Sequence, residues 1–289
     1  MSLWTGHDAG VTGDLARHHE SVNGTSHKRD RLRPMISVQI GPIARRVWRL
    51  ARTEIGTFAA LLVVAAGVMT FVDLAGDLTE ADGRAFDQAV LLALRPGGSA
   101  DGWGPRWLET AALDLTSLGG IAVLGLFALI VVLFLIMQRK RLSALLLSLG
   151  LVGGVALSEG LKATFGRDRP PAAWQAVETI NASFPSGHAM LSAVFYLSIG
   201  VMLTSAFPKR RFKAYVLGVA LLLTLIVGLT RVYLAAHWAS EVLAGWSVGA
   251  AWAMGLWLVA CAVQRRQAVH AGGPHDDTID DTDPPVTGE

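Results

Sequence analysis

Residues 115–137 read LTSLGGIAVLGLFALIVVLFLIM, a run of 23 positions without a charged side chain. A helix needs about 20 predominantly apolar residues to cross a bilayer, so this run predicts a membrane-spanning helix. Lipid offers no partners for backbone N–H and C=O groups, and a helix satisfies them internally. The fold class therefore depends on how many similar runs the chain contains.

Five further uncharged runs, of 17 to 22 residues, repeat this pattern. The composition of the 289-residue chain agrees, since 52% of the residues are hydrophobic and 17% are charged, with a mean hydropathy of +0.44. A soluble domain carries about 25% charged residues, so a disordered chain is excluded and a soluble one is disfavoured. We predict an all-α, polytopic membrane protein with six transmembrane helices in a bundle. The five runs are residues 55–72, 142–158, 189–207, 214–230 and 242–263.

Basic residues between the runs indicate which segments face the cytoplasm. Short cytoplasmic loops carry an excess of lysine and arginine, and four of the flanking segments are basic. The segment 73–114 has three basic and eight acidic residues, and we expect it on the opposite side. Six spans then place both termini in the cytoplasm. The basic segments contain Arg45, Arg46, Arg49 and Arg52; Arg139, Lys140 and Arg141; Lys209, Arg210, Arg211 and Lys213; and Arg265 and Arg266.

The two ends of the chain differ from its apolar centre. Residues 1–44 and the acidic residues 267–289 have compositions that cannot bury enough apolar surface to fold. Both are predicted to be disordered cytoplasmic tails around a membrane domain at 45–266. The irregular spacing of four histidines in the first tail favours a solvated segment over a metal-binding tract. The net charge of +2 indicates no nucleic-acid partner, and the single cysteine, Cys261, excludes an internal disulfide.

One short stretch of the segment 73–114 has helical periodicity. Phe86, Ala89, Val90, Ala93 and Leu94 recur at the spacing of one helical face, and the stretch is too short to span a bilayer. We predict a short amphipathic helix at the outer face, with the two tryptophans that follow it as anchors in the membrane interface. Packing against the bundle and shaping an entrance for a lipid both stay open as its role.

Cationic residues break the apolar pattern near the outer ends of the runs. Lys162, Arg167 and Arg169 follow the third run, and Arg231 lies at the end of the fifth. Ionisable groups in such places are functional candidates, because the outer side should be poor in basic residues. Glu159, one helical turn before Lys162, offers an ion pair as an alternative explanation for that lysine alone.

Two histidines lie beside these cations. Of eight histidines, only His188 and His237 lie in the predicted bundle, both at the outer ends of runs. Strong cations bind a dense anion, and imidazoles exchange protons near neutral pH. The combination predicts phosphate chemistry on one face of the membrane. Asp168 is interpreted as an ion-pair partner of Arg167 or Arg169 and not as a catalytic group.

Three segments around these residues have a recognisable order and spacing. They read KATFGRDRP at residues 162–170, PSGH at 185–188 and TRVYLAAHWASE at 230–241. These segments resemble the three signature motifs of the phosphatidic-acid-phosphatase type 2 superfamily, K-x6-R-P, P-S-G-H and S-R-x5-H-x3-D. The six runs extend the resemblance over residues 45–265.

The third segment departs from the family pattern at two positions. Thr230 stands where the motif has serine, which is a minor change. Glu241 stands where the motif has aspartate, so the carboxylate is kept but lies one methylene further from the backbone. His237 and Glu241 are four residues apart and share one helix face, so the carboxylate can still orient the imidazole.

The resemblance implies a role for each matching residue and requires no metal and no other cofactor. His237 would attack phosphorus to form a phosphohistidine, Glu241 would orient its ring, and His188 would protonate the leaving group. Ser186 and Gly187 would add donors at a helix N-terminus, which favours an anion. The phosphate-binding cations would be Lys162, Arg169 and Arg231.

The resemblance therefore implies a metal-independent phosphatase of the bacterial inner membrane. It would hydrolyse a lipid phosphomonoester or diphosphate at the outer leaflet, with the active site on the periplasmic face and the lipid chains in the bilayer. Family members act on phosphatidic acid, phosphatidylglycerophosphate and undecaprenyl diphosphate, and nothing in the sequence selects among them. Residues 174–182 are a candidate segment for selectivity.

Three alternatives follow from the same residues. A phosphohistidine that passed its phosphate to a second lipid would make the protein a phosphotransferase. Glu241 in place of aspartate would suit a non-catalytic lipid-binding relative. Vanadate-dependent haloperoxidases resemble the same motif set, but they are soluble, and the six runs argue against them.

Overall fold

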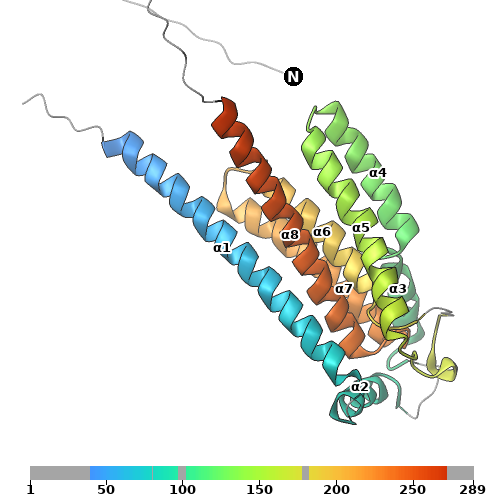
Figure 1. The fold of residues 1–289 in the computed structure, drawn as a ribbon. Coiled ribbons are helices and arrows are strands. Elements are labelled where there is room, and N and C mark those ends of the chain that lie inside the picture. The colour runs from blue at the N-terminus through green and yellow to red at the C-terminus, as the bar shows by residue number, and fades with distance from the viewer. Residues whose placement is uncertain (1–39, 80, 97–101, 178–181, 272–289) are drawn as a thin grey trace, which may run out of the picture. The chain divides into compact units, whose positions relative to one another are not determined.

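Helices make up the regular structure of the residues that the computed structural model describes, 40–79, 81–96, 102–177 and 182–271 (Figure 1). No strand occurs among these residues, so the all-α prediction is confirmed for them. The helices are α1 (Ile40–Gly76), η1 (Asp77–Thr79), α2 (Ala81–Leu94), α3 (Arg106–Ser117), α4 (Ile121–Met137), α5 (Arg141–Phe165), η3 (Ala172–Trp174), α6 (Gly187–Thr204), α7 (Arg210–Tyr233) and α8 (Ala239–Ala271).

Two compact units divide the chain, residues 1–48 and residues 49–289. The second unit contains α2 to α8 and most of α1. Most of the two predicted tails, residues 1–44 and 267–289, lies outside the described residues. The tails, and the limits that they give to the membrane domain, therefore stay predictions.

Five helices are long and apolar enough to cross a membrane, and a bent pair supplies a sixth candidate. The run predicted as one span at residues 115–137 is divided between α3 and α4, which are bent by 47° relative to each other. Gly119 and Gly120 each donate their N–H to a carbonyl three residues earlier, at 3.0 Å, so tight turns close α3 before α4 begins. A count of six spans requires the bent pair to cross as one and stays a prediction. The five single spans are Glu54–Gly76, Arg141–Phe165, Gly187–Thr204, Arg210–Tyr233 and Ala239–Gln267.

A helix is present as α2 where the sequence predicts one in the segment 73–114, and part of the predicted apolar stripe, Val90 and Leu94, packs against the core. Asp87 and Leu91 are buried, whereas Phe86 is 49% exposed. Asp87 accepts hydrogen bonds from the start of α8, and these bonds turn its side of the helix inward. Part of the apolar stripe is thereby left exposed, as are Trp103 and Trp107. Such exposure suits an interfacial helix, and the location of α2 at the outer membrane interface stays a prediction.

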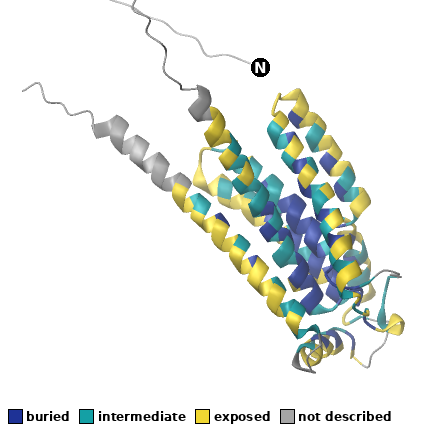
Figure 2. Cartoon of the chain, in the orientation of Figure 1, coloured by how far each residue is buried: buried dark blue, intermediate teal, exposed yellow. Residues whose placement is uncertain are grey.

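Helix α6 is the centre of the bundle, and it packs against α4, α5, α7 and α8. Figure 2 shows the buried residues concentrated along α6 and the parts of α7 and α8 next to it, whereas α1 is largely exposed. Glycines of α8 allow its close approach to α6, because a Cβ on Gly245 would lie 2.6 Å from Ser186 O and one on Gly249 would lie 2.5 Å from Met190 O. Small residues at helix crossings permit this kind of packing in membranes.

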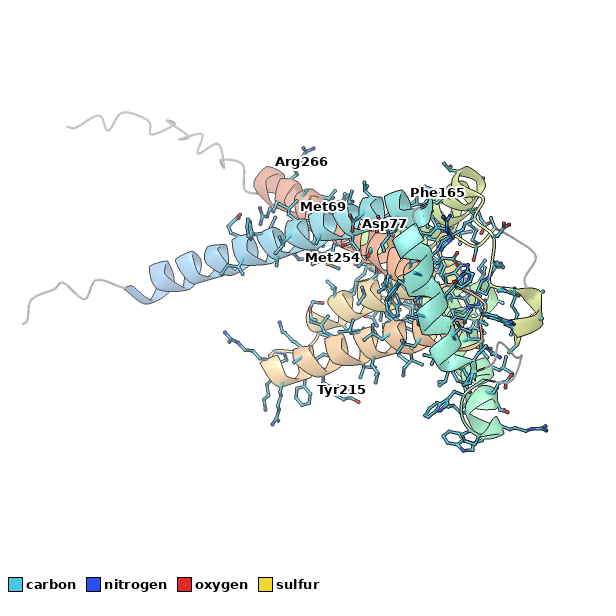
Figure 3. All side chains as sticks on the ribbon, turned by 90° about the horizontal axis from the view of Figure 1, so that it is seen from below. Met69, Asp77, Phe165, Tyr215, Met254 and Arg266 are labelled. Carbon is cyan, nitrogen blue, oxygen red and sulfur yellow. The ribbon has the colours of Figure 1, made fainter. Side chains whose placement is uncertain are left out.

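Four helix ends meet at one end of the bundle, which we call the site end. There α5 and α7 end, and α6 and α8 begin. Three aromatic rings pack together at this end: the ring centroid of Phe71 in α1 lies 6.0 Å from that of Phe165 and 5.6 Å from that of Phe184. Figure 3 places Phe165 at the site end, and Tyr215 and Arg266 towards the opposite end. All the residues predicted to act on phosphate lie in or next to these four helix ends.

The close packing of α8 on α6 predicts a stability effect. Gly249→Ala would place a methyl group 2.5 Å from Met190 O and 2.8 Å from the Cβ of Ala193, so the two helices would have to shift. We expect an overpacking cost of about 1–3 kcal/mol, measured as a lower melting temperature of the purified protein in detergent. Gly255→Ala on the same helix is the control, because a Cβ there meets nothing within 4 Å. Equal melting temperatures of the two variants would contradict the packing argument.

Candidate active site

The backbone turns back sharply at the end of α5. Gly166 ends this helix in the left-handed region, at φ +55°, and its N–H bonds to Lys162 O at 3.1 Å. Glycine adopts this conformation without the steric cost of a side chain. In the segment that follows, Arg167 O accepts a hydrogen bond from Ser183 N at 3.0 Å. This bond places the first motif beside the residues that precede α6.

His237 and Glu241 form the centre of the candidate site. Nδ1 of His237 lies 2.8 Å from Oε2 of Glu241, and both side chains are buried. The carboxylate also accepts the N–H of Trp238 at 3.2 Å, so it caps the first turn of α8 as well as holding the imidazole. The extra methylene of glutamate, relative to the aspartate of the motif, is accommodated within this arrangement.

Ser183 is a member of this cluster that sequence reasoning missed. Its hydroxyl donates a hydrogen bond to Oε2 of Glu241, and its Oγ lies 3.4 Å from Nδ1 of His237. The side chain is buried. Its only signal in the sequence is its position two residues before Pro185, where the second motif begins.

The partners of His237 define the roles of its two ring nitrogens. An ionised carboxylate only accepts hydrogen bonds, so Nδ1 carries the proton that bonds to Glu241. The lone pair then lies on Nε2, which is 3.3 Å from Nη1 of Arg169. Arg169 is held in place because Nη1 also donates to Ala236 O at 2.8 Å. The site thus places an unprotonated nitrogen directly beside a guanidinium group.

Burial and nearby cations favour the neutral form of His237. Burial is the largest cause that lowers the pKa of His237 well below its usual 6.5, and the positive charges of Arg231 and Arg169 follow. His188 and Lys162 act in the same direction, so all four of these groups lie within electrostatic reach of the imidazole. A neutral imidazole keeps the lone pair that a nucleophile needs.

Arg231 is a buried cation that has no acidic partner among the described residues. Its exposed fraction is 5%, Nη1 donates to Thr116 Oγ1 at 3.3 Å, and Nε has no hydrogen-bond partner. Burying a charge without an opposite charge is unfavourable, so stability does not explain this residue. A bound anion would supply the missing charge.

Lys162 and Gly187, two other predicted phosphate ligands, lie close to each other where α5 ends and α6 begins. Lys162 Nζ pairs with Glu159 Oε1 at 2.8 Å, which confirms the ion pair that the sequence offered. The same Nζ lies 3.4 Å from the position that a Cβ on Gly187 would take. Lys162 therefore lies beside the N-terminus of α6 even while it is paired.

Ser186 and His188 flank Gly187 on this turn. Ser186 is the N-cap of α6, where its Oγ accepts the N–H of Ala189 at 3.5 Å and its own N–H donates to Glu241 O at 3.1 Å. His188 lies against the bend between α3 and α4, because a Cβ on Gly120 would lie 3.9 Å from its Nε2. The bend therefore forms a wall beside this imidazole.

Arg167 belongs to a buried polar layer next to the site. Its Nη2 lies 2.7 Å from Asp87 Oδ2, and its Nη1 lies 2.9 Å from Ser240 Oγ and 3.4 Å from Glu241 Oε1. Asp87 also accepts the N–H and the hydroxyl of Ser240, at 2.9 and 2.6 Å. The carboxylates that pair with Arg167 are Asp87, 80 positions away in the sequence, and Glu241, and not Asp168. The alternative pairing of Asp168 with Arg169 stays a prediction.

A cavity of about 260 Å³ borders this polar layer. Neither His188 nor His237 lines it, so it lies beside the polar layer and not at the imidazoles. Its lining consists of Leu74, Asp77, Leu78, Gly83, Phe86, Asp87, Arg167 and Ser240.

The fold and the site define a class of protein: a helical membrane protein with two imidazoles, a carboxylate and several cations at one end of its bundle. Among the described residues, no group of three or more histidine, cysteine or acidic side chains could hold a metal ion. The groups nearest the lone pair of His237 are instead cations, which suit an anionic ligand.

Comparison with known proteins shows which proteins the chain resembles. The sequence model of the PAP2 superfamily matches residues 141–265, a range that includes all eight predicted site residues. Phosphatidylglycerophosphatase B of Bacillus subtilis (strain 168) is 29% identical over 196 residues, which are 68% of this chain and 88% of that protein. Residues 141–265 match the PAP2 superfamily model, and this stretch contains the three motifs that predict the resemblance.

A crystal structure agrees with this resemblance. The transmembrane PAP2-type phosphatidylglycerolphosphate phosphatase from Bacillus subtilis matches with a TM-score of 0.64 and 27% identity, over 70% of this chain and 98% of that one. The multi-pass membrane fold and the phosphatase class are therefore confirmed at the level of the family. The roles of individual site residues, the span count and the membrane face stay predictions.

The polar layer predicts a strong effect for one substitution outside the motifs. Asp87→Asn removes the negative charge 2.7 Å from Arg167 and breaks the shorter of that arginine's two ion pairs, in which the acid is buried. Breaking a buried pair in this way costs about 3–5 kcal/mol, so we expect a clearly lower melting temperature. Asp168→Asn is the matched control, because its side chain is exposed. An Asp87→Asn protein that melts with the control would show that the layer does not stabilise the site.

The environment of His237 predicts its protonation state. Because the pKa of His237 lies well below 6.5, the ring should stay neutral, with the proton on Nδ1, when the pH falls from 8 to about 6. Nitrogen-15 NMR of histidine-labelled protein measures this directly, and a His237→Asn sample assigns the signal. A His237 ring that becomes protonated near pH 6.5 would contradict the expectation.

Proposed function

We propose that the chain is an integral-membrane lipid phosphatase that works through a phosphohistidine on His237. The observation that carries the proposal is the geometry of this residue: Glu241 holds Nδ1 at 2.8 Å, and Arg169 lies 3.3 Å from Nε2. A phosphoryl oxygen bound by that guanidinium would bring phosphorus next to the lone pair. The buried Arg231 offers a second positive charge for the same phosphate.

The first step transfers the phosphoryl group to the enzyme. Nε2 of His237 attacks phosphorus, and the bond between phosphorus and the leaving oxygen breaks. His188 gives its proton to that oxygen, so the lipid leaves as an alcohol or, from a diphosphate, as a monophosphate. The ring of His237 becomes positive in this step, and the carboxylate of Glu241 stabilises it.

The second step returns the enzyme to its starting state. Neutral His188 takes a proton from water, and the hydroxide attacks phosphorus as the bond to Nε2 breaks. Inorganic phosphate leaves, and both histidines regain their original protonation. The cations hold the same phosphoryl oxygens in both steps, and this stabilises the charge in each transition state.

The names of the relatives suggest the first substrate to test. Both matched proteins are phosphatidylglycerophosphate phosphatases by name, so we propose this lipid as the leading candidate, with phosphatidic acid and undecaprenyl diphosphate as competitors. The site end lies next to α2 and α3, which belong to the acidic segment 73–114. By the positive-inside rule, we propose that this end faces the periplasm and draws its lipid from the outer leaflet.

A phosphate-release panel over defined lipids tests the proposal. We expect the purified protein to release phosphate from at least one of the three lipids, with turnover unaffected by EDTA. His237→Ala and His188→Ala should each reduce turnover by at least 10³-fold. His275→Ala is the control, since it changes a histidine outside the matched residues 141–265. An alkaline quench with labelled lipid should recover phosphate on histidine in the wild type but not in His237→Ala.

The other outcomes separate the alternatives. Phosphate that appears on an added acceptor lipid, with none released, would make the protein a phosphotransferase. A wild type that is inactive on every lipid would contradict the proposal, and activity gained by Glu241→Asp would then identify a non-catalytic relative. Full activity of either histidine variant would overturn the assigned roles.

A further inference from the structure

Ser158 is a buried hydroxyl that the motifs do not explain. It lies in α5, one turn before Lys162, and only 2% of it is exposed. Its Oγ has no hydrogen-bond partner. A buried polar group without a partner costs about 1–3 kcal/mol, and lipid around the bundle offers it none. Such a group in a membrane helix therefore needs an explanation.

Other helical hydroxyls of this protein satisfy themselves within their own helix. Ser148 Oγ donates to Ala144 O at 3.0 Å, and Thr164 Oγ1 donates to Gly160 O at 2.9 Å, both in α5. Ser247 in α8 does the same with Leu243 O at 2.8 Å. Ser158 does not make this bond, so its hydroxyl is free to donate to something outside its own helix.

The direction of this hydroxyl is given by its neighbours. A Cβ on Gly187 would lie 3.2 Å from Ser158 Oγ and 3.4 Å from Lys162 Nζ. Serine and lysine therefore flank the same point, beside the first residue of α6. The first backbone N–H groups of a helix have no acceptor within it and point towards an anion. The Ser158 hydroxyl, the lysine ammonium and this helix end face one small region.

We infer that Ser158 is a phosphate-binding residue, with its hydroxyl donating to a phosphoryl oxygen held between Lys162 and the first turn of α6. The inference rests on the proposed function, which it extends by one ligand outside the three motifs. Ser158 lies one turn deeper in the bundle than Lys162, so it would contact the phosphoryl group from the side away from the membrane surface. Its hydroxyl adds one hydrogen-bond donor for the phosphoryl group to those of Lys162 and the first turn of α6.

Close helix packing is the competing explanation for a small residue at this position. Alanine distinguishes the two, because it keeps the small size and removes only the hydroxyl. If packing alone matters, Ser158→Ala changes nothing in phosphate affinity. If the hydroxyl is a ligand, the variant loses affinity, and it is at least as stable as the wild type because an unsatisfied polar group has been removed.

The test measures inorganic phosphate binding and lipid turnover on the full-length protein in detergent. We expect Ser158→Ala to raise the dissociation constant for inorganic phosphate about ten-fold, because hydrogen bonds to charged groups are among the stronger ones. The KM for the lipid phosphate should rise with it, and the melting temperature should be unchanged or higher. Ser148→Ala in the same helix is the control, with phosphate affinity within about two-fold of the wild type.

Two results would overturn the inference. One is a Ser158→Ala protein that binds phosphate as tightly as the Ser148→Ala control, and the other is a loss of affinity that comes with a lower melting temperature. Failure of the proposed function is separate, since it means no phosphate release from any lipid by the wild type. In that case inorganic phosphate binding still decides the role of Ser158.

Discussion

The rest of the site depends on the hydrogen bonds that the carboxylate of Glu241 accepts. One oxygen accepts hydrogen bonds from His237, Ser183 and the backbone of Trp238. The carbonyl of the same residue accepts the N–H of Ser186 at 3.1 Å. Through one residue, the start of α8 is therefore connected to the turn after α7 and to the start of α6. In a bundle whose other contacts are mostly apolar and non-directional, such directional bonds define the relative positions of the reacting groups.

The polar layer behind Glu241 explains how a glutamate can serve where the motif has aspartate. A longer side chain has more rotamers, and a freely moving carboxylate would orient the imidazole poorly. Here Arg167 lies 3.4 Å from the second oxygen, and Asp87 fixes Arg167 in turn. These contacts restrict the carboxylate at Oε1, while Oε2 bonds to His237. Helix α2 thus supports the centre of the site although its sequence carries no motif.

Much of the fold and part of the site could be predicted from the sequence, and the limits have physical causes. Apolar runs identify α5 to α8 because a membrane helix must be apolar along its whole length. Successive runs cross the membrane in opposite directions, and this also places His188 and His237 at the same end of the bundle. The bend between α3 and α4 was missed because local turns at Gly119 and Gly120 leave hydropathy unchanged. Ser183 and Asp87 were missed because their hydrogen bonds join segments that are distant in the sequence, and no local pattern records such bonds.

The distribution of charge at the site end favours an anion as the ligand. Three acids of the site end are engaged with partners there: Glu159 with Lys162, Asp87 with Arg167, and Glu241 with His237. Arg231 has no acidic partner among the described residues, although it is buried. These three acids pair with other groups, so none of them neutralises Arg231. The positive potential at Nε2 of His237 is therefore built into the fold before any ligand arrives, as electrostatic stabilisation of a phosphoryl group requires.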